Sequence, residues 1–205
     1  MNSQNKLTKL PEIILFLEKA FDLINRDWFD NQLERPVITI APTTKLYGHY
    51  TMYNAWSVDS EQKREINISC YTIKRPIKEV ISTLVHEMTH MYNDLILNVK
   101  DCSNRGRYHN KMFKKAAEEH GLLVLKDPRN GWSITTPSEA LLKWIKLHPE
   151  FQDICTYKIE LEQKKSEKKK TNRFQFEYKC SFCGTFCKST ERITVFCKNC
   201  NKQMY

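Results

Sequence analysis

The sequence predicts an α+β protein, in which helices pack on a small and mostly antiparallel sheet, followed by a small cysteine-rich domain. Apolar residues recur every three or four positions in four separate segments, as they do in amphipathic helices. Short segments rich in Val, Ile, Thr and Tyr lie between these segments and are typical of strands. Two Cys-x2-Cys pairs stand near the C-terminus, at Cys180/Cys183 and Cys197/Cys200.

The predicted elements can be placed in order along the chain. In the first part of the chain they are a helix over 11–33, strands over 36–41, 46–56 and 65–71, a helix over 76–97, a polar loop over 99–108, a helix over 109–120, strands over 122–125 and 132–135, and a helix over 138–146. Pro11 suits the first turn of the first helix, and Thr136 or Ser138 can cap the last one. Near the C-terminus, 186–189 and 193–196 are expected to form a hairpin.

The segment His86-Glu87-Met88-Thr89-His90 lies within the helix predicted over 76–97. Two imidazoles four residues apart lie on one face of a helix, about 6 Å apart along its axis, where both can bind one zinc ion. The apolar residues of this helix fall on another face, which argues against two histidines buried in the core. The carboxylate of Glu87 is placed to act as a general base on a zinc-bound water, so Glu87 is the predicted catalytic residue.

A catalytic zinc needs a third protein ligand. The metzincin pattern and an H-x3-H-x5-H pattern both require histidine at position 96, where this chain has Ile96. The candidates further along are His109, Glu118, Glu119 and His120. His109, at the start of the next predicted helix, is favoured over Glu118. His120 lies about 16 Å further along that helix, too far to share the metal, and is expected to be a helix-end residue.

These segments resemble the SprT-like metalloproteases, which include the Spartan proteases. His86 to His90, followed by His109-Asn110-Lys111-Met112-Phe113, is similar to the family pattern of H-E-x-x-H, a short loop and H-x-x-x-F. The segments 46–50 and 65–69 resemble the two strands before the active helix in that family. Many relatives have Gly-Pro after the third histidine, where this chain has Asn110-Lys111. The resemblance covers about residues 10–150, and a C-terminal zinc ribbon is common in bacterial and viral members.

The resemblance implies a zincin-like metalloprotease core and a zinc-dependent endopeptidase activity. It also implies a role in DNA repair, with substrates that are proteins attached to DNA, such as DNA–protein crosslinks, and with DNA as an activator. For the oxyanion-stabilising residue, Tyr50, Tyr53 and Arg107 are candidates, and the sequence does not choose among them.

The cysteines predict a second, structural zinc site. Cys180, Cys183, Cys197 and Cys200 form two Cys-x2-Cys pairs 13 residues apart, and such pairs complete a tetrahedral site. Cys187 lies between the pairs and is an alternative ligand. The remaining cysteines, Cys70, Cys102 and Cys155, are expected to be ordinary thiols. We therefore expect two zinc ions per chain, one catalytic and one structural.

Neither a secretory signal nor an apolar run long enough to span a membrane is visible in the sequence. We therefore expect a cytoplasmic protein that makes no contact with membranes, and eight cysteines in that reducing compartment are better explained as ligands and thiols than as disulfides. The Lys-, Asn- and Ile-rich composition is compatible with an AT-rich bacterium or its phage.

Positive charge is concentrated in the C-terminal part. The net charge is +9, of which residues 1–157 carry +2 and residues 158–205 carry +7. We expect a metalloprotease domain over 1–157, a basic linker over 158–173 and a four-cysteine ribbon over 174–205. The linker contains a basic run over 164–173 that can contact DNA phosphates or can simply be solvated. Aromatic residues near the run can stack on unpaired bases or form the core of the ribbon: Phe174, Phe176, Tyr178, Phe182 and Phe186.

Two functions of different classes remain open. One is a zinc endopeptidase that acts on DNA-associated proteins. The other is a nucleic-acid-binding zinc protein, for example one associated with transcription, in which the protease fold performs no proteolysis. Metal-assisted hydrolysis of a non-peptide bond is a third and weaker option. The presence of Glu87 favours the endopeptidase, because zinc binding alone does not require it.

Overall fold

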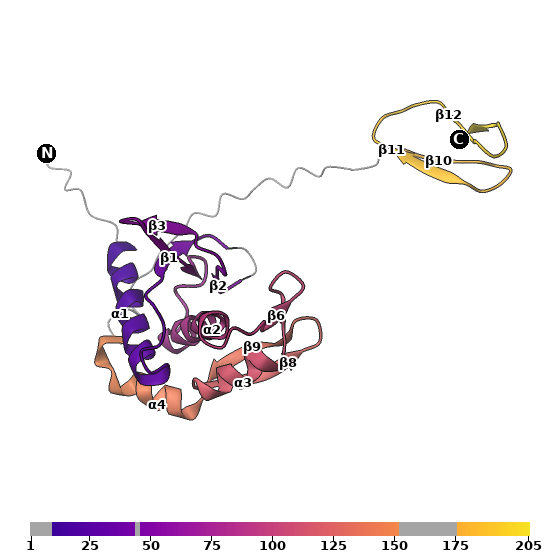
Figure 1. Ribbon diagram of the computed structural model, residues 1–205. Helices are drawn as coiled ribbons and strands as arrows, with labels where there is room; N and C mark the ends of the chain where they lie inside the picture. The colour runs from indigo at the N-terminus through magenta and orange to yellow at the C-terminus, as the bar shows by residue number, and fades with distance from the viewer. Residues whose placement is uncertain (1–9, 44–45, 152–175) are drawn as a thin grey trace, which may run out of the picture. The chain divides into compact units, whose positions relative to one another are not determined.

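The computed structural model describes residues 10–43, 46–151 and 176–205 (Figure 1). The chain divides into two compact units, Met1–Leu161 and Glu162–Tyr205. The predicted linker over 158–173 and its basic run, together with Cys155 and Phe174, lie outside the described residues. None of the described helices is long and apolar enough to cross a membrane.

The first unit confirms the predicted α+β class. In chain order its elements are α1 (Leu10–Trp28), β1 (Val37–Ala41), β2 (Gly48–Tyr50), β3 (Trp56–Val58), β4 (Glu61–Lys63), β5 (Glu65–Ser69), α2 (Ile77–Leu95), β6 (Cys102–Ser103), β7 (Tyr108–His109), α3 (Lys111–Glu119), β8 (Leu122–Asp127), β9 (Gly131–Pro137), α4 (Glu139–Leu147) and the 3-10 helix η1 (Pro149–Phe151). The sheets have the orders β1-β5-β2 and β6-β7-β9-β8, and β3 pairs with β4 alone. Most strand pairs are antiparallel, as expected, and β1–β5 and β7–β9 are parallel.

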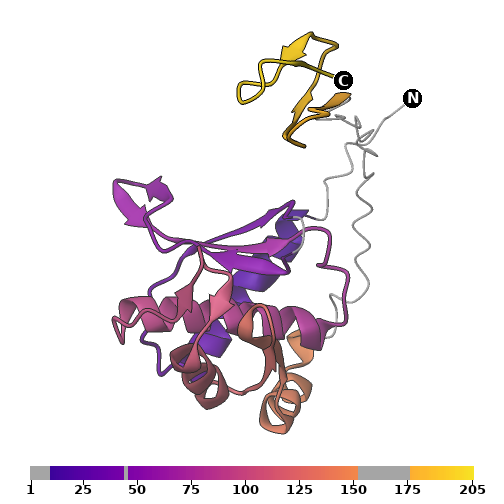
Figure 2. The same cartoon turned by 90° about the vertical axis from the view of Figure 1, so that its right-hand side faces the viewer.

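Helix α2 is the centre of the unit. It lies between the three-stranded sheet on one side and α3 with β8 and β9 on the other (Figures 1 and 2). Its apolar residues, among them Ile81, Leu84 and Met88, are fully buried in the core. The predicted helix over 76–97 is confirmed within two residues at each end. The histidines of the motif are therefore held on a helix that is packed from both sides.

Helix α1 is shorter than the sequence predicts. It ends at Trp28, and the chain then turns through Asp30 and Asn31, which have φ values of 51° and 55°. The Asn25 side chain accepts a hydrogen bond from the Leu33 amide and donates one to the Leu33 carbonyl. These hydrogen bonds fold the loop after α1 back onto the helix, so Leu33 is buried although it lies beyond the helix end. An apolar residue at position 33 therefore made the predicted helix too long.

The strand predicted over 46–56 is wrong in its second half. Strand β2 covers only Gly48–Tyr50, and the chain leaves the sheet to form the β3–β4 hairpin. All three residues of β3 are exposed. Trp56, the last residue of the predicted strand, therefore belongs to β3, and the β3–β4 hairpin projects from the unit (Figure 2).

The segment predicted as a loop over 99–108 contains the short strands β6 and β7, and the third helix begins at Lys111 instead of residue 109. His109 is thus the last residue of β7, where its backbone amide donates a hydrogen bond to the Asn130 carbonyl. Strands β8 and β9 are longer than predicted. Helix α4 has Ser138 as its N-cap, one of the two caps expected.

The second unit consists of two antiparallel pairs in its described part, β10 (Phe176–Lys179) with β11 (Phe186–Ser189) and β12 (Val195–Phe196) with β13 (Gln203–Met204). The hairpin expected between 186–189 and 193–196 is therefore wrong, because each segment pairs with a different strand. The unit has a small core of its own around Cys180, Cys197 and Met204. The four cysteines gathered at this core fit a zinc ribbon.

Candidate metal centre

Three imidazoles from two elements converge on one point. His86 and His90 come from α2 and His109 from the end of β7, and the Nε2 atom of His109 lies 3.2 Å from that of His86 and 3.1 Å from that of His90. Three nitrogens bound to one tetrahedral zinc at 2.0–2.1 Å would be about 3.3 Å apart. The spacing of the nitrogens therefore fits a zinc ion, and nitrogen donors of this kind suit that metal.

Phe113 packs against all three imidazoles. Its ring centroid lies 4.6 Å from those of His86 and His109 and 4.5 Å from that of His90. Phe113 is fully buried one turn into α3. The aromatic ring thus limits the orientations of the three imidazoles. This contact gives a physical reason for a phenylalanine four residues after the third histidine.

Asn110 ties this helix to the loop before it. As the N-cap of α3, its side-chain oxygen accepts hydrogen bonds from the amides of Met112 and Phe113. Its side-chain nitrogen donates to the Lys100 carbonyl, and its own amide donates to the Asp101 carbonyl. Asparagine is among the best N-cap residues. The chain therefore has a well-formed start of α3 directly after the third histidine.

The outer nitrogens of two imidazoles have partners that the sequence did not predict. His90 Nδ1 lies 2.7 Å from the buried Asp101 carboxylate, which also accepts a hydrogen bond from Asn93. His86 Nδ1 lies 3.0 Å from the Thr135 hydroxyl of β9. With Nε2 facing the metal, each Nδ1–H donates to its oxygen partner. Such contacts fix the tautomer and the ring orientation of zinc ligands.

The charge states of the three histidines differ. Burial lowers the pKa of His86 well below its usual value and lowers that of His109 to about 4. Burial is the largest single influence on His90 and acts to lower its pKa, but the hydrogen bonds to Asp101 and Cys102 and the negative charges of Asp101 and Glu87 together outweigh it and raise the pKa to about 10. Two imidazoles are therefore neutral and ready to bind a metal, and binding to His90 displaces a proton.

Glu87 is buried beside the histidines. Burial raises its pKa to about 7, although the Tyr50 backbone amide donates a hydrogen bond to it. Gly48 of β2 makes room for this carboxylate, since a Cβ there would lie 3.1 Å from Glu87 Oε1 and 2.8 Å from the Asn67 carbonyl oxygen. A carboxyl group with a pKa near neutrality can both accept and return a proton.

Strand β9 holds the third ligand in place. Gly131 pairs with His109 in the parallel β7–β9 ladder, at a φ of +70°. A Cβ at this position would overlap the His109 carbonyl oxygen. The close approach of the two strands at the metal centre therefore requires glycine.

The side chains of the other candidates from the sequence either bind other residues or face solvent. Tyr50 donates a hydrogen bond from its hydroxyl to Asp94, and burial together with this contact raises its pKa, whereas Tyr53 and Arg107 are exposed to solvent. Glu118 forms an ion pair with Lys114 on the surface. His120 stacks on Phe29 with the ring centroids 3.9 Å apart, at the end of α3 as expected.

The second unit gathers a separate set of ligands. The sulfur atoms of Cys180, Cys183, Cys197 and Cys200 all lie within 4.8 Å of one another, and Cys187 is not in this group. Cys187 instead faces Tyr178 across the β10–β11 pair. The hydrogen bonds of Cys183 to Thr185 and then to Cys197 lower its thiol pKa to about 6, whereas the hydrogen bond to Cys183 raises the pKa of Cys200, so Cys183 is the first of the two to form the thiolate that binds zinc.

Metal ligands on one helix or turn can be recognised in the sequence by their spacing. The residues that form hydrogen bonds to those ligands are much harder to recognise. Asp101 could have been suspected, because a carboxylate commonly accepts the second N–H of a zinc-binding histidine and this one stands between the second and third ligands. Thr135 gave no such signal, since 49 residues separate it from His86.

Comparisons with known proteins agree with this site. The SprT-like family model matches residues 17–135, a range that begins within α1, ends within β9 and includes the three histidines, Glu87, Phe113 and Asp101. No curated protein and no solved structure matches the chain significantly. Since the matched range is more than half of the chain, and since the residues it contains converge on one possible zinc site, the protein belongs to the SprT-like family.

Proposed function

We propose that the protein is a zinc-dependent endopeptidase that acts on proteins associated with DNA, such as DNA–protein crosslinks. The observation that carries the proposal is the convergence of three imidazole nitrogens beside the buried carboxylate of Glu87. Membership of the SprT-like family, which is of zinc metallopeptidase type, supports it. We expect the protein to act in the cytoplasm, where its cysteines stay reduced.

Each residue of the site has a distinct part in this proposal. A bound zinc would supply a Lewis acid that activates water and polarises the scissile carbonyl. His86, His90 and His109 would hold it, and Asp101 and Thr135 keep two of these rings in the binding orientation. Glu87 accepts the proton of the attacking water and delivers it to the leaving amine, for which a pKa of about 7 is well suited.

The protein substrate would be bound as an extended chain along β2. This strand is at the edge of its sheet, because among the described strands it pairs with β5 alone. Its Tyr50 amide faces Glu87, so the open edge runs past the carboxylate. Pairing through backbone hydrogen bonds makes few demands on side chains, which suits cleavage of varied proteins.

We propose that DNA is contacted through the basic tail and the ribbon. The ribbon exposes Phe182 and Phe186, with Lys202 and Lys188 near their ring faces. Tyr178 instead packs against the small core and accepts a hydrogen bond from the Ile193 amide. Exposed aromatic rings beside lysines are suited to stacking on unpaired bases.

The proposal is tested by self-cleavage and casein cleavage, each with and without single-stranded DNA, in wild type and Glu87→Gln. We expect the variant to bind the same amount of zinc and to lose at least about 100-fold in rate, since removing a general base commonly costs 10²–10⁴-fold. Equal rates with equal zinc contents would contradict proteolysis at this site. They would favour a nucleic-acid-binding zinc protein instead.

A further inference from the structure

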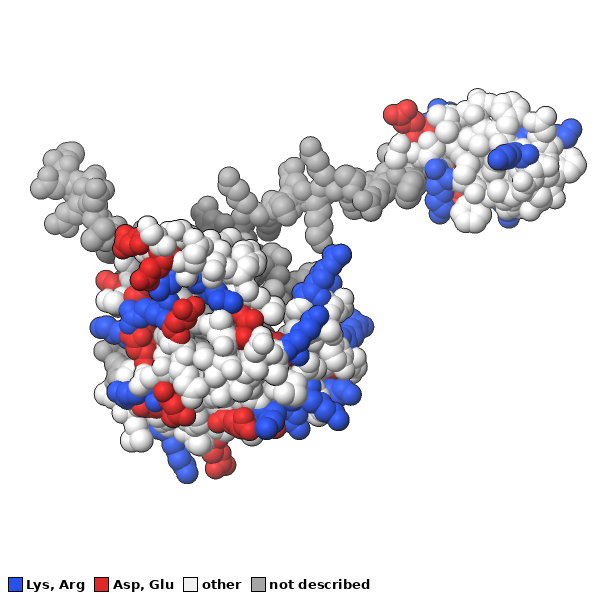
Figure 3. Space-filling model, viewed as in Figure 1, with Lys and Arg blue, Asp and Glu red and all other residues white. Residues whose placement is uncertain are grey.

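Basic residues are concentrated on one face of the first unit. Residues 98–132 contain eight Lys and Arg and four Asp and Glu, whereas the rest of 1–157 has more acidic than basic residues. In Figure 3 blue side chains gather on the right-hand side of the unit, where Figure 1 places β6, β8, β9 and α3. Red and blue are mixed elsewhere on the same view.

Most of these cations have no acidic partner. Lys111 on α3, Lys126 near the end of β8 and Arg129 in the β8–β9 turn are exposed, and within the described part of the chain none of them forms an ion pair. The same is true of Lys100, Arg105 and Arg107 around the β6–β7 hairpin. In other parts of the unit Arg35, Arg64 and Arg75 pair with carboxylates, whereas the exposed Lys143 and Lys146 of α4 form no ion pair with a described residue. Unpaired cations grouped on one face create a positive potential there.

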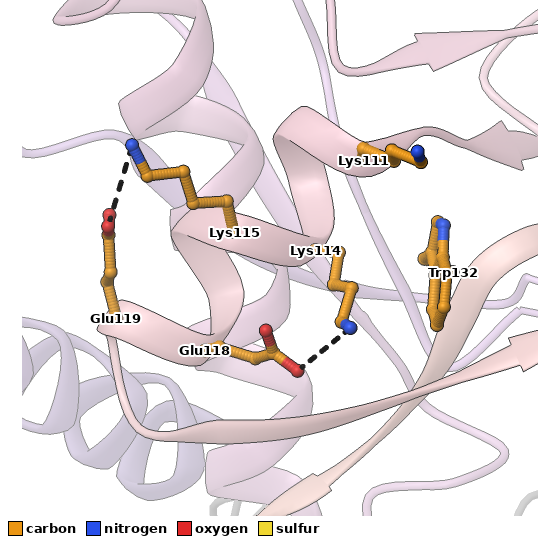
Figure 4. Close-up of a pocket in the computed structure, with 6 residues that line it drawn as sticks. All are labelled: Lys111, Lys114, Lys115, Glu118, Glu119 and Trp132. Carbon is orange, nitrogen blue, oxygen red and sulfur yellow. Dashed lines mark ion pairs between the residues drawn. The ribbon is translucent and has the colours of Figure 1, made fainter.

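A shallow groove with an aromatic wall lies on this face (Figure 4). Trp132 of β9 forms the wall, and Lys111 and Lys114 of α3 line the groove beside it. Lys114 Nζ lies 4.3 Å from the centroid of the Trp132 ring, and Lys126 Nζ lies 5.9 Å from it. Lys114 also pairs with Glu118, and further from Trp132 Lys115 pairs with Glu119, so these carboxylates balance some of the charge (Figure 4).

Strand β9 lines the groove and also contacts two of the three histidines. Trp132 follows Gly131, which pairs with His109, and three residues further along β9 Thr135 contacts His86. Lys111 is two residues after His109. A ligand held in the groove would therefore be bound next to the backbone that carries the third histidine.

We propose that this face of the first unit binds single-stranded nucleic acid, with Trp132 stacking on a base and Lys111, Lys114 and Lys126 contacting phosphates. Grouped cations beside a partly exposed aromatic ring, as Trp132 is here, are the combination that suits unpaired strands. A cation–π contact at a partly exposed site is weak, so a base can take the ring face of Trp132 and leave Lys114 for a phosphate. This surface is additional to the tail and ribbon proposed above.

The charge contribution is tested with matched double variants of the full chain. Lys111→Gln with Lys126→Gln removes two charges from the face, and Lys143→Gln with Lys146→Gln removes two from exposed lysines of α4 that have no ion-pair partner among the described residues. Binding of a fluorescent oligothymidylate is measured by anisotropy from 50 to 300 mM salt. We expect the first pair to weaken binding roughly tenfold at 0.1 M salt and to reduce the salt slope by about 1.4. The α4 pair should have a clearly smaller effect, and equal effects would overturn the proposal.

The stacking contribution is tested with Trp132→Leu, which keeps an apolar side chain against the core. Affinity for the single strand should fall roughly fivefold or more, while affinity for a duplex of the same length should stay near that of wild type. An equal loss of affinity for the single strand and for the duplex would contradict stacking of a base on Trp132. Poly-glutamate binding that competes with the oligonucleotide and shows the same sensitivity to Trp132→Leu would show instead that the face binds acidic polypeptides.

These measurements are independent of proteolysis. Affinity can be measured with Glu87→Gln as the background, so that the substrate and the protein itself stay intact. Absence of cleavage would contradict the proposed function and leave the nucleic-acid surface standing. Conversely, an equal loss of affinity in the Lys111/Lys126 and Lys143/Lys146 double variants would contradict the proposed surface. It would not contradict the proposed peptidase activity.

Discussion

At the scale of single residues, Gly131 decides whether the third histidine can reach the metal. We expect Gly131→Ala to separate β9 from β7, because the new Cβ would overlap the His109 carbonyl oxygen at a backbone φ of +70°. The histidine site should lose its zinc while the ribbon keeps its own. Zinc measured per chain should therefore fall from about two to about one.

Gly106→Ala is the matched control for Gly131→Ala. Gly106 has a φ of +80°, but a Cβ there would have no atom within 4 Å. Its replacement adds only the strain of a left-handed residue, about 1–2 kcal/mol, and should leave the zinc content unchanged. If both variants lost the same amount of zinc, strain alone and not the close approach of the strands would be the cause.

The oxygen partners of the imidazoles should contribute unequally to zinc affinity. Asp101→Ala removes the buried carboxylate that orients His90 and also leaves Asn93 without its acceptor. Competition with a chelator should show a loss of about 10–100-fold in zinc affinity. Thr135→Val removes a neutral partner of His86 and should cost less, since bonds to charged groups are the stronger ones. The opposite ranking of the two variants would contradict this assignment.

The predictability of the site differs from residue to residue for physical reasons. His86, Glu87 and His90 share one helix, so their spacing alone predicts that they lie together. His109 was favoured by residue type and by its place after the motif, but its strand was not predicted. Thr135 reaches the site only through the pairing of β9 with β7 and the packing of β9 on α2, and such long-range contacts leave no local pattern in the sequence.

At the scale of elements, the start of α3 links helix stability to the metal centre. Asn110→Ala removes the cap of the helix that carries Phe113, together with the hydrogen bond to Lys100. We expect a loss of about 1 kcal/mol in the free energy of unfolding, accompanied by weaker zinc binding. Urea unfolding and chelator competition measure the two effects.

Ser138→Ala removes the corresponding cap of α4, where the Ser138 hydroxyl accepts a hydrogen bond from the Leu141 amide. Its cost in stability should be similar, but zinc affinity should not change, because α4 carries no ligand. A zinc affinity lowered equally by both variants would show that general destabilisation, and not the position of Phe113, explains the first result.

Elements with a long periodic pattern were predicted best. The helix over 76–97 is confirmed because its apolar residues face a core on a regular 3.6-residue period. The β3–β4 hairpin was missed because the Tyr and Trp residues of 46–56 are typical of strands, so a single strand was predicted up to Trp56, which instead begins the exposed strand β3. Strands β6 and β7 contain two residues each, too few to show any alternation in the sequence.

The contact between α1 and α4 should depend on pH through Asp27. Its carboxylate accepts a hydrogen bond from Trp144 Nε1 and pairs with Arg26, and the Arg26 contact above all lowers its pKa from 3.8 to about 2. A lowered folded-state pKa contributes stability that is complete above about pH 4 and is lost as the pH falls through about 2. Because Asp27 is partly exposed, we expect less than about 1 kcal/mol.

This contribution is measured by urea unfolding of wild type and Asp27→Asn between pH 2 and 6. The wild type should be the more stable protein at pH 5 to 6, and the difference should shrink steadily below pH 4. A difference that stays constant down to pH 2 would contradict the role of ionised Asp27. Comparing the two proteins at each pH cancels effects common to both, such as loss of zinc in acid.

At the scale of the whole molecule, each unit combines its own core with its own set of ligands. The large core surrounds α2 and supports the histidines, and the small core of the second unit is built around the cysteines. A unit as small as the second buries too little apolar surface to fold without further stabilisation. Its folding should therefore depend on zinc, whereas that of the first unit should not.

Cys180→Ser combined with Cys197→Ser tests this division of the chain. We expect the zinc content to fall from two to one and the second unit to unfold, because structural zinc supplies the folding free energy of such small domains. The melting of the first unit and its zinc at the histidines should stay unchanged, since the two units have separate cores. Cys187→Ser serves as the matched control and should keep both zinc ions, because Cys187 lies outside the group of four. Loss of one zinc in that control would instead make Cys187 a ligand, and loss of both in the double variant would show that the units depend on each other.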